Sequence, residues 1–163
     1  MTTETQALPA IDMYDLQIVD VVYQKDKLQF DKKTVKDEVY LVLDLLGTEN
    51  PEQENEPYRA RMFDLRDGSM VYTDKTGATK FSNVGKVLTS AGFKKEDLEG
   101  KKFKDLNWPA LKGFYIRGPI TIRENAEGKS FINVKAAGVL PLRNPKHLEF
   151  NMDHKAEFLG GAA

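Results

Sequence analysis

Apolar and polar residues alternate along the stretch 114–123, as they do in a strand with one buried face. Its even positions are mostly apolar, whereas its odd positions include Tyr115, Arg117 and Arg123. Residues 130–134 repeat this alternation after a turn. Strand character also appears earlier in the chain, at residues 14–24, 38–47 and 58–66. The pattern therefore predicts five strands.

A different spacing appears between the third and fourth strands. Apolar residues three or four positions apart predict one helix of about three turns, and they are Phe81, Val84, Val87, Leu88 and Ala91. Ser82 or Asn83 can cap its start, and Gly92 can end it. The order β-β-β-α-β-β is that of a five-stranded, partly closed OB-fold barrel. We predict a mainly β, OB-fold-like protein with one short helix, although other small β-rich folds share this order.

The 163 residues suit a single domain. We expect a flexible N-terminal arm at residues 1–12, the OB-like β domain at 13–143 and a C-terminal tail at 144–163. The tail offers at most a weak helical turn. A phase change near Asp20 predicts a bulge in the first strand.

The turn between the last two strands fixes their register. Asn125 suits the first position of a type I turn, and Gly128 suits a left-handed position three residues later. This register pairs Asn125 with Lys129, Arg123 with Phe131, Thr121 with Asn133, Ile122 with Ile132, Ile120 with Val134 and Pro119 with Lys135. The outer face then carries Tyr115, Arg117, Arg123, Lys129, Phe131, Asn133 and Lys135.

This mixture of rings and cations is what a single-stranded nucleic acid requires, because bases stack on aromatic side chains while Lys and Arg follow the phosphates. Two further segments extend the expected surface. Arg59 and Arg61 share one face of the third strand with Phe63, and Lys101 and Lys102 directly precede an aromatic residue at position 103. Two alternatives remain: the face is an ordinary polar sheet surface, or its rings are covered by the tail or a partner chain.

Charge is unevenly distributed, although the net charge is only −1. Residues 1–57 carry 5 basic and 13 acidic side chains, whereas residues 81–135 carry 11 basic and 6 acidic ones. The basic middle of the chain is compatible with an anionic partner. Such a partner has to avoid Asp15, Glu38 and Asp44, and the acidic loop at 47–57 would repel it.

Other classes of protein find little support in the sequence. The chain has no cysteine, which excludes disulfides and thiolate metal sites, and it shows no secretory signal or apolar run that could span a membrane. Gly85-Lys86 lacks the Ser or Thr of a phosphate loop, and no G-x-S-x-G is present. His147 and His154 lie in the expected tail, so we predict no metal site, no cofactor and no enzyme activity.

The succession "VLTSAGF", "DLEGKKF", "GKSFINV" and then a proline resembles small phage single-stranded-DNA-binding proteins of the OB type, over about residues 36–142. The resemblance implies a phage replication or recombination accessory protein that coats single strands in the host cytoplasm as a homo-oligomer. It carries over to Tyr115, Arg117 and Phe131. Many such proteins end in an acidic tail, whereas this chain ends in "EFLGGAA".

We therefore predict single-stranded DNA binding by base stacking and phosphate contacts. The main alternative is a viral structural or assembly protein, in which the arm 1–12, the tail and the exposed rings form subunit interfaces. A third option is a protein partner bound through the acidic loop. The sequence does not separate DNA from RNA, and it gives neither the oligomeric state nor the source.

Overall fold

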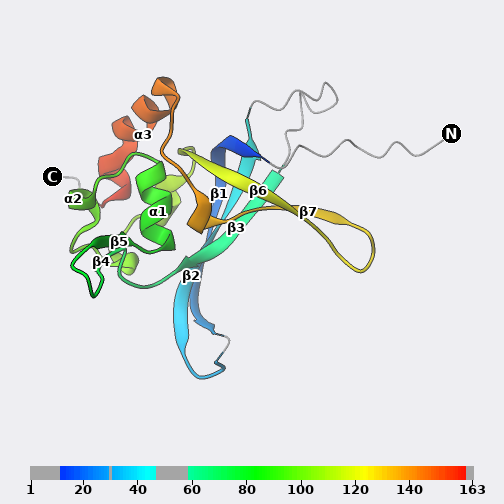
Figure 1. Cartoon of the computed structure of the whole chain (residues 1–163), viewed down its shortest axis with the longest axis horizontal. Helices are drawn as coiled ribbons and strands as arrows, with labels where there is room; N and C mark the ends of the chain where they lie inside the picture. Colours follow the sequence, from blue (N-terminus) through cyan, green and yellow to red (C-terminus); the bar gives the residue numbers. More distant parts are fainter. Residues whose placement is uncertain (1–11, 30, 47–58, 161–163) are drawn as a thin grey trace.

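The computed structural model describes residues 12–29, 31–46 and 59–160, and five of its strands are hydrogen-bonded in a closed ring. Around the ring the order is β1 (Met13–Leu28), β2 (Val35–Leu45), β3 (Arg59–Arg66), β7 (Ser130–Val134) and β6 (Tyr115–Glu124). β6 pairs back onto β1, and only the contact between β3 and β7 is parallel. Figure 1 shows the helices on one side of the strands, with the β1–β2 and β6–β7 hairpins extending away from them.

Alternation along the strands directs their apolar side chains into the ring. On β2, Val39, Leu41, Leu43 and Leu45 are almost completely buried, while the residues between them lie on the outer face. β1 stays paired with β2 through a shift of register between Ile18 and Asp20, the position at which the change of phase in the sequence predicts a bulge. A second shift follows between Gln24 and Lys27.

The predicted register of the β6–β7 hairpin is confirmed from its turn to the pair Ile120–Val134. The side-chain carbonyl oxygen of Asn125 accepts hydrogen bonds from the backbone N–H groups of Glu127 and Lys129, and Gly128 has a φ of +80°. The expected pairing of Pro119 with Lys135 is wrong. Pro119 lies opposite Met13 of β1, because β6 leaves β7 to close the ring.

The predicted helix is α1 (Asn83–Ser90), and the side-chain oxygen of Ser82 accepts a hydrogen bond from the backbone N–H of Gly85 at its start. The expectation of a single helix is wrong, since the described residues form three α-helices. The others are α2 (Lys95–Leu98) and α3 (Pro145–Phe158). Short 3₁₀ turns lie at η2 (Phe103–Asp105), η3 (Trp108–Leu111) and η4 (Ala136–Gly138), and a small hairpin joins β4 (Val71–Thr73) to β5 (Thr79–Phe81).

α3 occupies most of the segment expected to be a tail. Asn144 caps it, Pro145 stands in its first turn, and Phe158 is fully buried. The apolar pattern is weak because Asn151, a polar residue, takes a fully buried position on the side that faces the body. Tertiary contacts, rather than helical spacing, therefore stabilise this helix.

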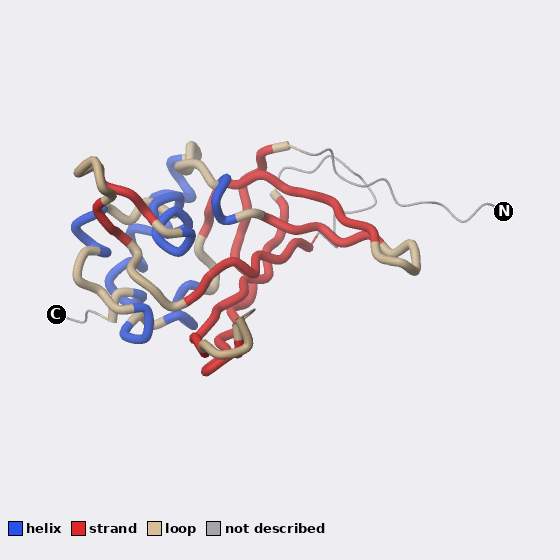
Figure 2. Tube along the Cα trace, turned by 60° about the horizontal axis from the view of Figure 1, so that its bottom comes forward, coloured by secondary structure: helices blue, strands red, loops and turns tan. Residues whose placement is uncertain are grey.

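An aromatic cluster joins α3 to the rest of the molecule. The ring of Phe158 packs edge-on against Trp108 and Phe93, each at a centroid distance of 5.3 Å. Phe103 lies 4.8 Å from Trp108, whose indole N–H donates to the Phe103 carbonyl. Figure 2 shows this helical layer beside the strands. None of the helices among residues 12–29, 31–46 and 59–160 is long and apolar enough to cross a membrane.

The buried amide of Asn151 holds α3 against β6. Its oxygen accepts a hydrogen bond from the Tyr115 N–H (2.9 Å), and its nitrogen donates to the carbonyls of Tyr115 (2.7 Å) and Ala91 (2.9 Å). We expect Asn151→Ala to lower the free energy of unfolding by about 2–3 kcal/mol, because it leaves buried backbone groups without partners. Urea unfolding measures this loss.

Asn107→Ala is the matched control, because Asn107 is exposed and its side chain makes no capping hydrogen bond. An equal, small effect of the two substitutions would contradict the anchoring role of Asn151.

Candidate functional site

A groove of about 930 Å³ lies between β3 and the β6–β7 hairpin. The side chains that give it chemical character come from both elements, and they are Arg59, Arg61 and Phe63 of β3 and Arg123, Lys129, Phe131 and Asn133 of the hairpin. Five of the ten residues predicted to bind nucleic acid thus line one groove: Arg59, Arg61, Arg123, Lys129 and Phe131.

These residues meet because of the register of two pairings. The parallel contact aligns Ala60 with Ile132 and Arg61 with Asn133, so the start of β3 lies beside β7. Ala60 is buried, and the alternation of the strand therefore places Arg61 on the outer face. Across the hairpin, Arg123 lies opposite Phe131, as predicted.

The groove combines exposed rings with cations. The Phe63 and Phe131 residues are 48% and 41% exposed, which leaves ring surface open to solvent. The ammonium group of Lys129 lies 5.5 Å from the centroid of the Phe131 ring, at the distance of a cation–π contact. Arg61 and Arg123 form no ion pair with the residues that the structure describes.

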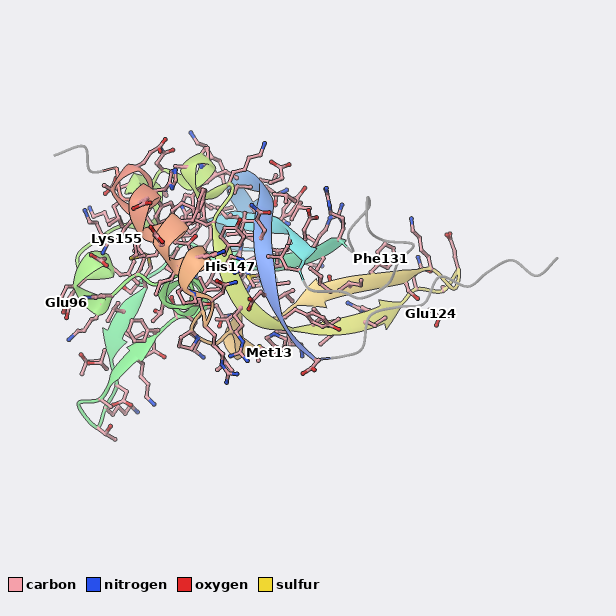
Figure 3. The ribbon with its side chains drawn as sticks, turned by 90° about the horizontal axis from the view of Figure 1, so that it is seen from above. Met13, Glu96, Glu124, Phe131, His147 and Lys155 are labelled. Atoms are coloured by element: carbon pink, nitrogen blue, oxygen red, sulfur yellow. The ribbon has the colours of Figure 1, made fainter. Side chains whose placement is uncertain are left out.

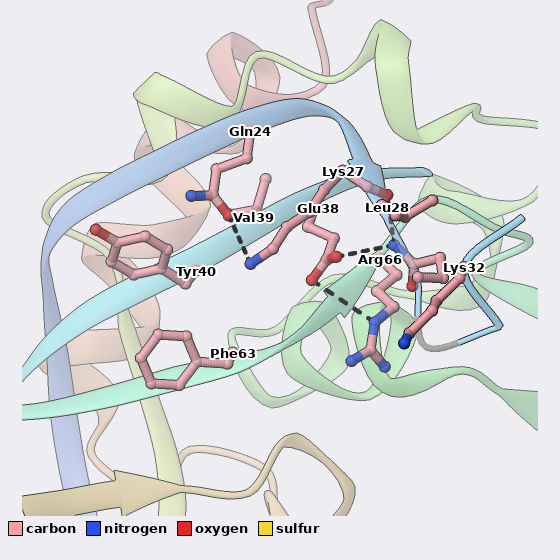
Figure 4. A pocket seen from close by; sticks show the side chains of 10 residues that line it. Gln24, Lys27, Leu28, Lys32, Glu38, Val39, Tyr40, Phe63 and Arg66 are labelled. Carbon is pink, nitrogen blue, oxygen red and sulfur yellow. Dashed lines mark hydrogen bonds and ion pairs between the residues drawn. The ribbon is translucent and has the colours of Figure 1, made fainter. Parts of the chain in front are cut away.

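A second pocket continues the groove toward the β1–β2 hairpin. Phe63 lines both cavities, and its ring lies 5.3 Å from that of Tyr40 on β2, at an interplanar angle of 35°. Figure 4 shows Tyr40 and Phe63 side by side, with Lys27, Lys32 and Arg66 further along the pocket. The outer face of β2 and β3 therefore carries a strip of aromatic rings between two projecting hairpins.

Hydrogen bonds between β1 and β2 fix the β1–β2 hairpin beside this strip of aromatic rings. The Tyr23 hydroxyl donates to Asp37 at 2.5 Å, and the backbone N–H of Asp26 donates to the other oxygen at 3.0 Å. These bonds lower the pKa of Asp37. Burial and the neighbouring Asp37 carboxylate raise the pKa of Tyr23, so its hydroxyl stays protonated and continues to donate.

Each of the three acidic side chains that a phosphate would have to avoid lies near a basic or histidine side chain. Asp44 pairs with Arg59 at 2.5 Å, and Glu38 lies 3.6 Å from the Arg66 guanidinium. Asp15 faces His147 at 3.5 Å. The acidic loop 47–57 lies outside the described residues. Among the described residues that line the groove, Arg59, Arg61, Arg123 and Lys129 are basic, whereas Glu124 is acidic.

Tyr115 does not reach the groove. Its ring stacks on His147 of α3, with centroids 4.0 Å apart and an angle of 4°, and Phe150 packs edge-on against it at 5.6 Å. The expected continuous outer face is therefore divided: α3 covers its first part, and only the hairpin end stays open. Figure 3 shows this separation, with His147 over the body and Phe131 out along the hairpin.

The other predicted residues also lie outside both cavities. Arg117 lies opposite Asp15 in the backbone pairing of β6 with β1, and its carbonyl accepts a hydrogen bond from the N–H of Leu140. Lys135 follows the end of β7. Lys101 and Lys102 are exposed beside α2, but the ring next to them, Phe103, is buried in the aromatic cluster and offers no stacking surface.

Tyr40 is the residue that sequence reasoning missed. It belongs to a stretch that appears almost continuously apolar, yet its alternation with Val39 and Leu41 assigns it to the outer face. Arg66 and the lysines of the β1–β2 hairpin join it only through the pairing of β1, β2 and β3. Local alternation could have found Tyr40, but nothing local could have found its neighbours.

No protein-family model matches the chain, and no curated protein matches it either.

The exposure of the groove rings yields a stability prediction. We expect Phe63→Ala and Phe131→Ala to change the free energy of unfolding by less than about 1 kcal/mol, because each residue keeps more than 40% of its surface exposed and neither belongs to the buried core. Phe114→Ala should cost about 3–5 kcal/mol, since that ring is fully buried. Thermal or urea unfolding compares the three variants, and a large loss for Phe131→Ala would mean that its ring is part of the core.

Proposed function

We propose that this protein binds single-stranded DNA on the outer face of β2, β3 and β7, and that its ring of strands is an OB-type barrel. One observation carries the proposal: among the described residues, three aromatic side chains and seven cations line two cavities that share Phe63, between two projecting hairpins. In OB-folds, oligonucleotides bind across the second and third strands, between the loops that follow the first and fourth strands. Within the ring described here, those loops are the β1–β2 and β6–β7 hairpins.

Base stacking would supply much of the affinity. Tyr40, Phe63 and Phe131 each expose a ring along the strip, and a stacked base contributes about 1–3 kcal/mol. Every base has an aromatic face, so this part of the binding energy depends little on sequence.

Phosphate contacts would come from the cations along the edges of the groove. Arg61 and Arg123 line the groove and form no ion pair with the described residues, so both can bind phosphates. Arg59 can turn from Asp44 toward a phosphate. The net charge of −1 does not oppose such binding, because the interaction is local and the acidic residues Asp44 and Glu38 each lie beside an arginine. We extend the proposal to a phage accessory protein acting in the host cytoplasm as a homo-oligomer, in keeping with the resemblance of the sequence.

A role as an assembly protein is the second candidate, and one observation favours it. Leu28 and Val35 pair near the tip of the β1–β2 hairpin and are 55% and 53% exposed. Such an apolar tip suits a contact with a neighbouring subunit. Light scattering without nucleic acid separates the candidates, since large regular assemblies favour the structural role.

Substitution of the groove rings tests the binding proposal. In fluorescence anisotropy with a labelled single strand of about 30 nucleotides, we expect Phe63→Ala and Phe131→Ala each to weaken binding about tenfold. Tyr72→Ala is the matched control, because Tyr72 is also 48% exposed but lies on β4, outside both cavities. Equal affinities for all three variants would overturn the proposed site, and an RNA strand of the same sequence tests the choice of DNA.

Salt dependence tests the phosphate contacts separately. We expect Arg61→Ala and Arg123→Ala each to lower the slope of log K against log salt by about 0.7, because each removes one single-strand phosphate contact. Lys80→Ala changes an exposed cation on β5, away from the groove, and should leave the slope unchanged. A reduction of equal size in the control would indicate a diffuse electrostatic effect rather than a defined path.

A further inference from the structure

The pocket beside the β1–β2 hairpin contains a carboxylate that stacking and phosphate binding do not require. Glu38 is only 8% exposed, yet it lines this cavity of about 430 Å³ on the same outer face of β2 as Tyr40. Removing a carboxylate from water is costly unless polar partners compensate it. A buried carboxylate in a pocket proposed to hold part of an anionic polymer is therefore unfavourable, unless it binds a specific hydrogen-bond donor of that polymer.

The partners of Glu38 leave part of its acceptor capacity free. The side-chain amide of Gln29 donates to Oε2 at 2.9 Å, whereas Nε of Arg66 lies 3.6 Å from Oε1, too far for a hydrogen bond. A carboxylate offers about four acceptor positions on its two oxygens. Figure 4 shows Arg66 on the side of Glu38 that lies away from the rings of Tyr40 and Phe63.

The other residues that line the pocket indicate which kind of ligand could donate hydrogen bonds to this carboxylate. Tyr40 and Phe63 form an aromatic wall, and Leu28 adds an apolar one. Lys27 and Lys32 bring positive charge to the same pocket, which suits a neighbouring phosphate and opposes a cationic ligand. The expected occupant is thus flat, aromatic, attached to an anion and rich in N–H donors.

We propose that this pocket takes a guanine base of the bound single strand, with Glu38 reading its Watson–Crick edge; this rests on the proposed function. Guanine presents two adjacent donors on that edge, N1–H and the N2 amino group, which match the two oxygens of one carboxylate. Adenine and cytosine each present one amino donor there, and thymine presents a single N–H. The protein therefore binds strands of any sequence but settles with a guanine in this pocket.

Single-base substitution in an otherwise uniform strand tests the preference. The probes are labelled thymidine strands of about 12 nucleotides, a length within the usual site size, that carry one central guanine, hypoxanthine, adenine or no substitution. One guanine per strand avoids four-stranded structures, and hypoxanthine differs from guanine only by the missing N2 amino group. We expect the guanine strand to bind about fivefold to tenfold more tightly than the hypoxanthine strand.

Two variants assign the preference to the pocket. Glu38→Gln should reduce the guanine-to-hypoxanthine ratio to about one while affinity for the all-thymidine strand stays within about twofold. Asp44→Asn is the matched control, since Asp44 is a paired carboxylate on the same face of β2 but outside this pocket, and it should keep the ratio. If Glu38→Gln fails to fold by circular dichroism, Leu28→Trp replaces it, because Leu28 is exposed and a larger ring there narrows the pocket.

The outcomes separate the two proposals. Equal affinity of the wild-type protein for the guanine and hypoxanthine strands, with the thymidine strand still bound, overturns guanine recognition and leaves single-strand binding intact. A guanine preference that persists in Glu38→Gln or Leu28→Trp also overturns the assignment to this pocket. Absence of binding to every strand overturns single-strand binding itself, and guanine recognition with it.

Discussion

The short parallel contact between β3 and β7 is the interaction on which the architecture of this protein depends. Among the described residues, two pairs define it: Ala60 with Ile132 and Arg61 with Asn133. It closes the ring, because every other neighbouring pair of ring strands is antiparallel and could form without it. The same contact places the cations of β3 against the β6–β7 hairpin, so the closed ring and the groove depend on one pairing.

Sequence patterns predict the parts of this structure that local chemistry determines. The register of the β6–β7 hairpin follows from Asn125 and Gly128, and the bulge of β1 follows from a change of phase. α1 follows from helical spacing with a capping serine. In each case the residues that specify the feature lie within a few positions of one another.

Local sequence patterns do not predict the long-range strand pairing or the packing of α3. Asn151 appears unsuited to a buried helical position until the backbone of Tyr115 is placed beside it. For the same reason Tyr115 seemed to share an open face with Phe131, although α3 covers its ring with His147. Five of the ten predicted site residues line the groove, and the other five lie outside both cavities.

The anchoring of α3 also sets an order of events during synthesis of the chain. Phe158 completes the packing around Trp108, and Asn151 completes the hydrogen bonding of the first residue of β6. A ribosome releases these two residues only after all five ring strands have emerged. Until α3 docks, Trp108 and Phe93 lack the Phe158 ring that packs against them, so a nascent chain leaves part of its aromatic cluster open to water and to chaperones.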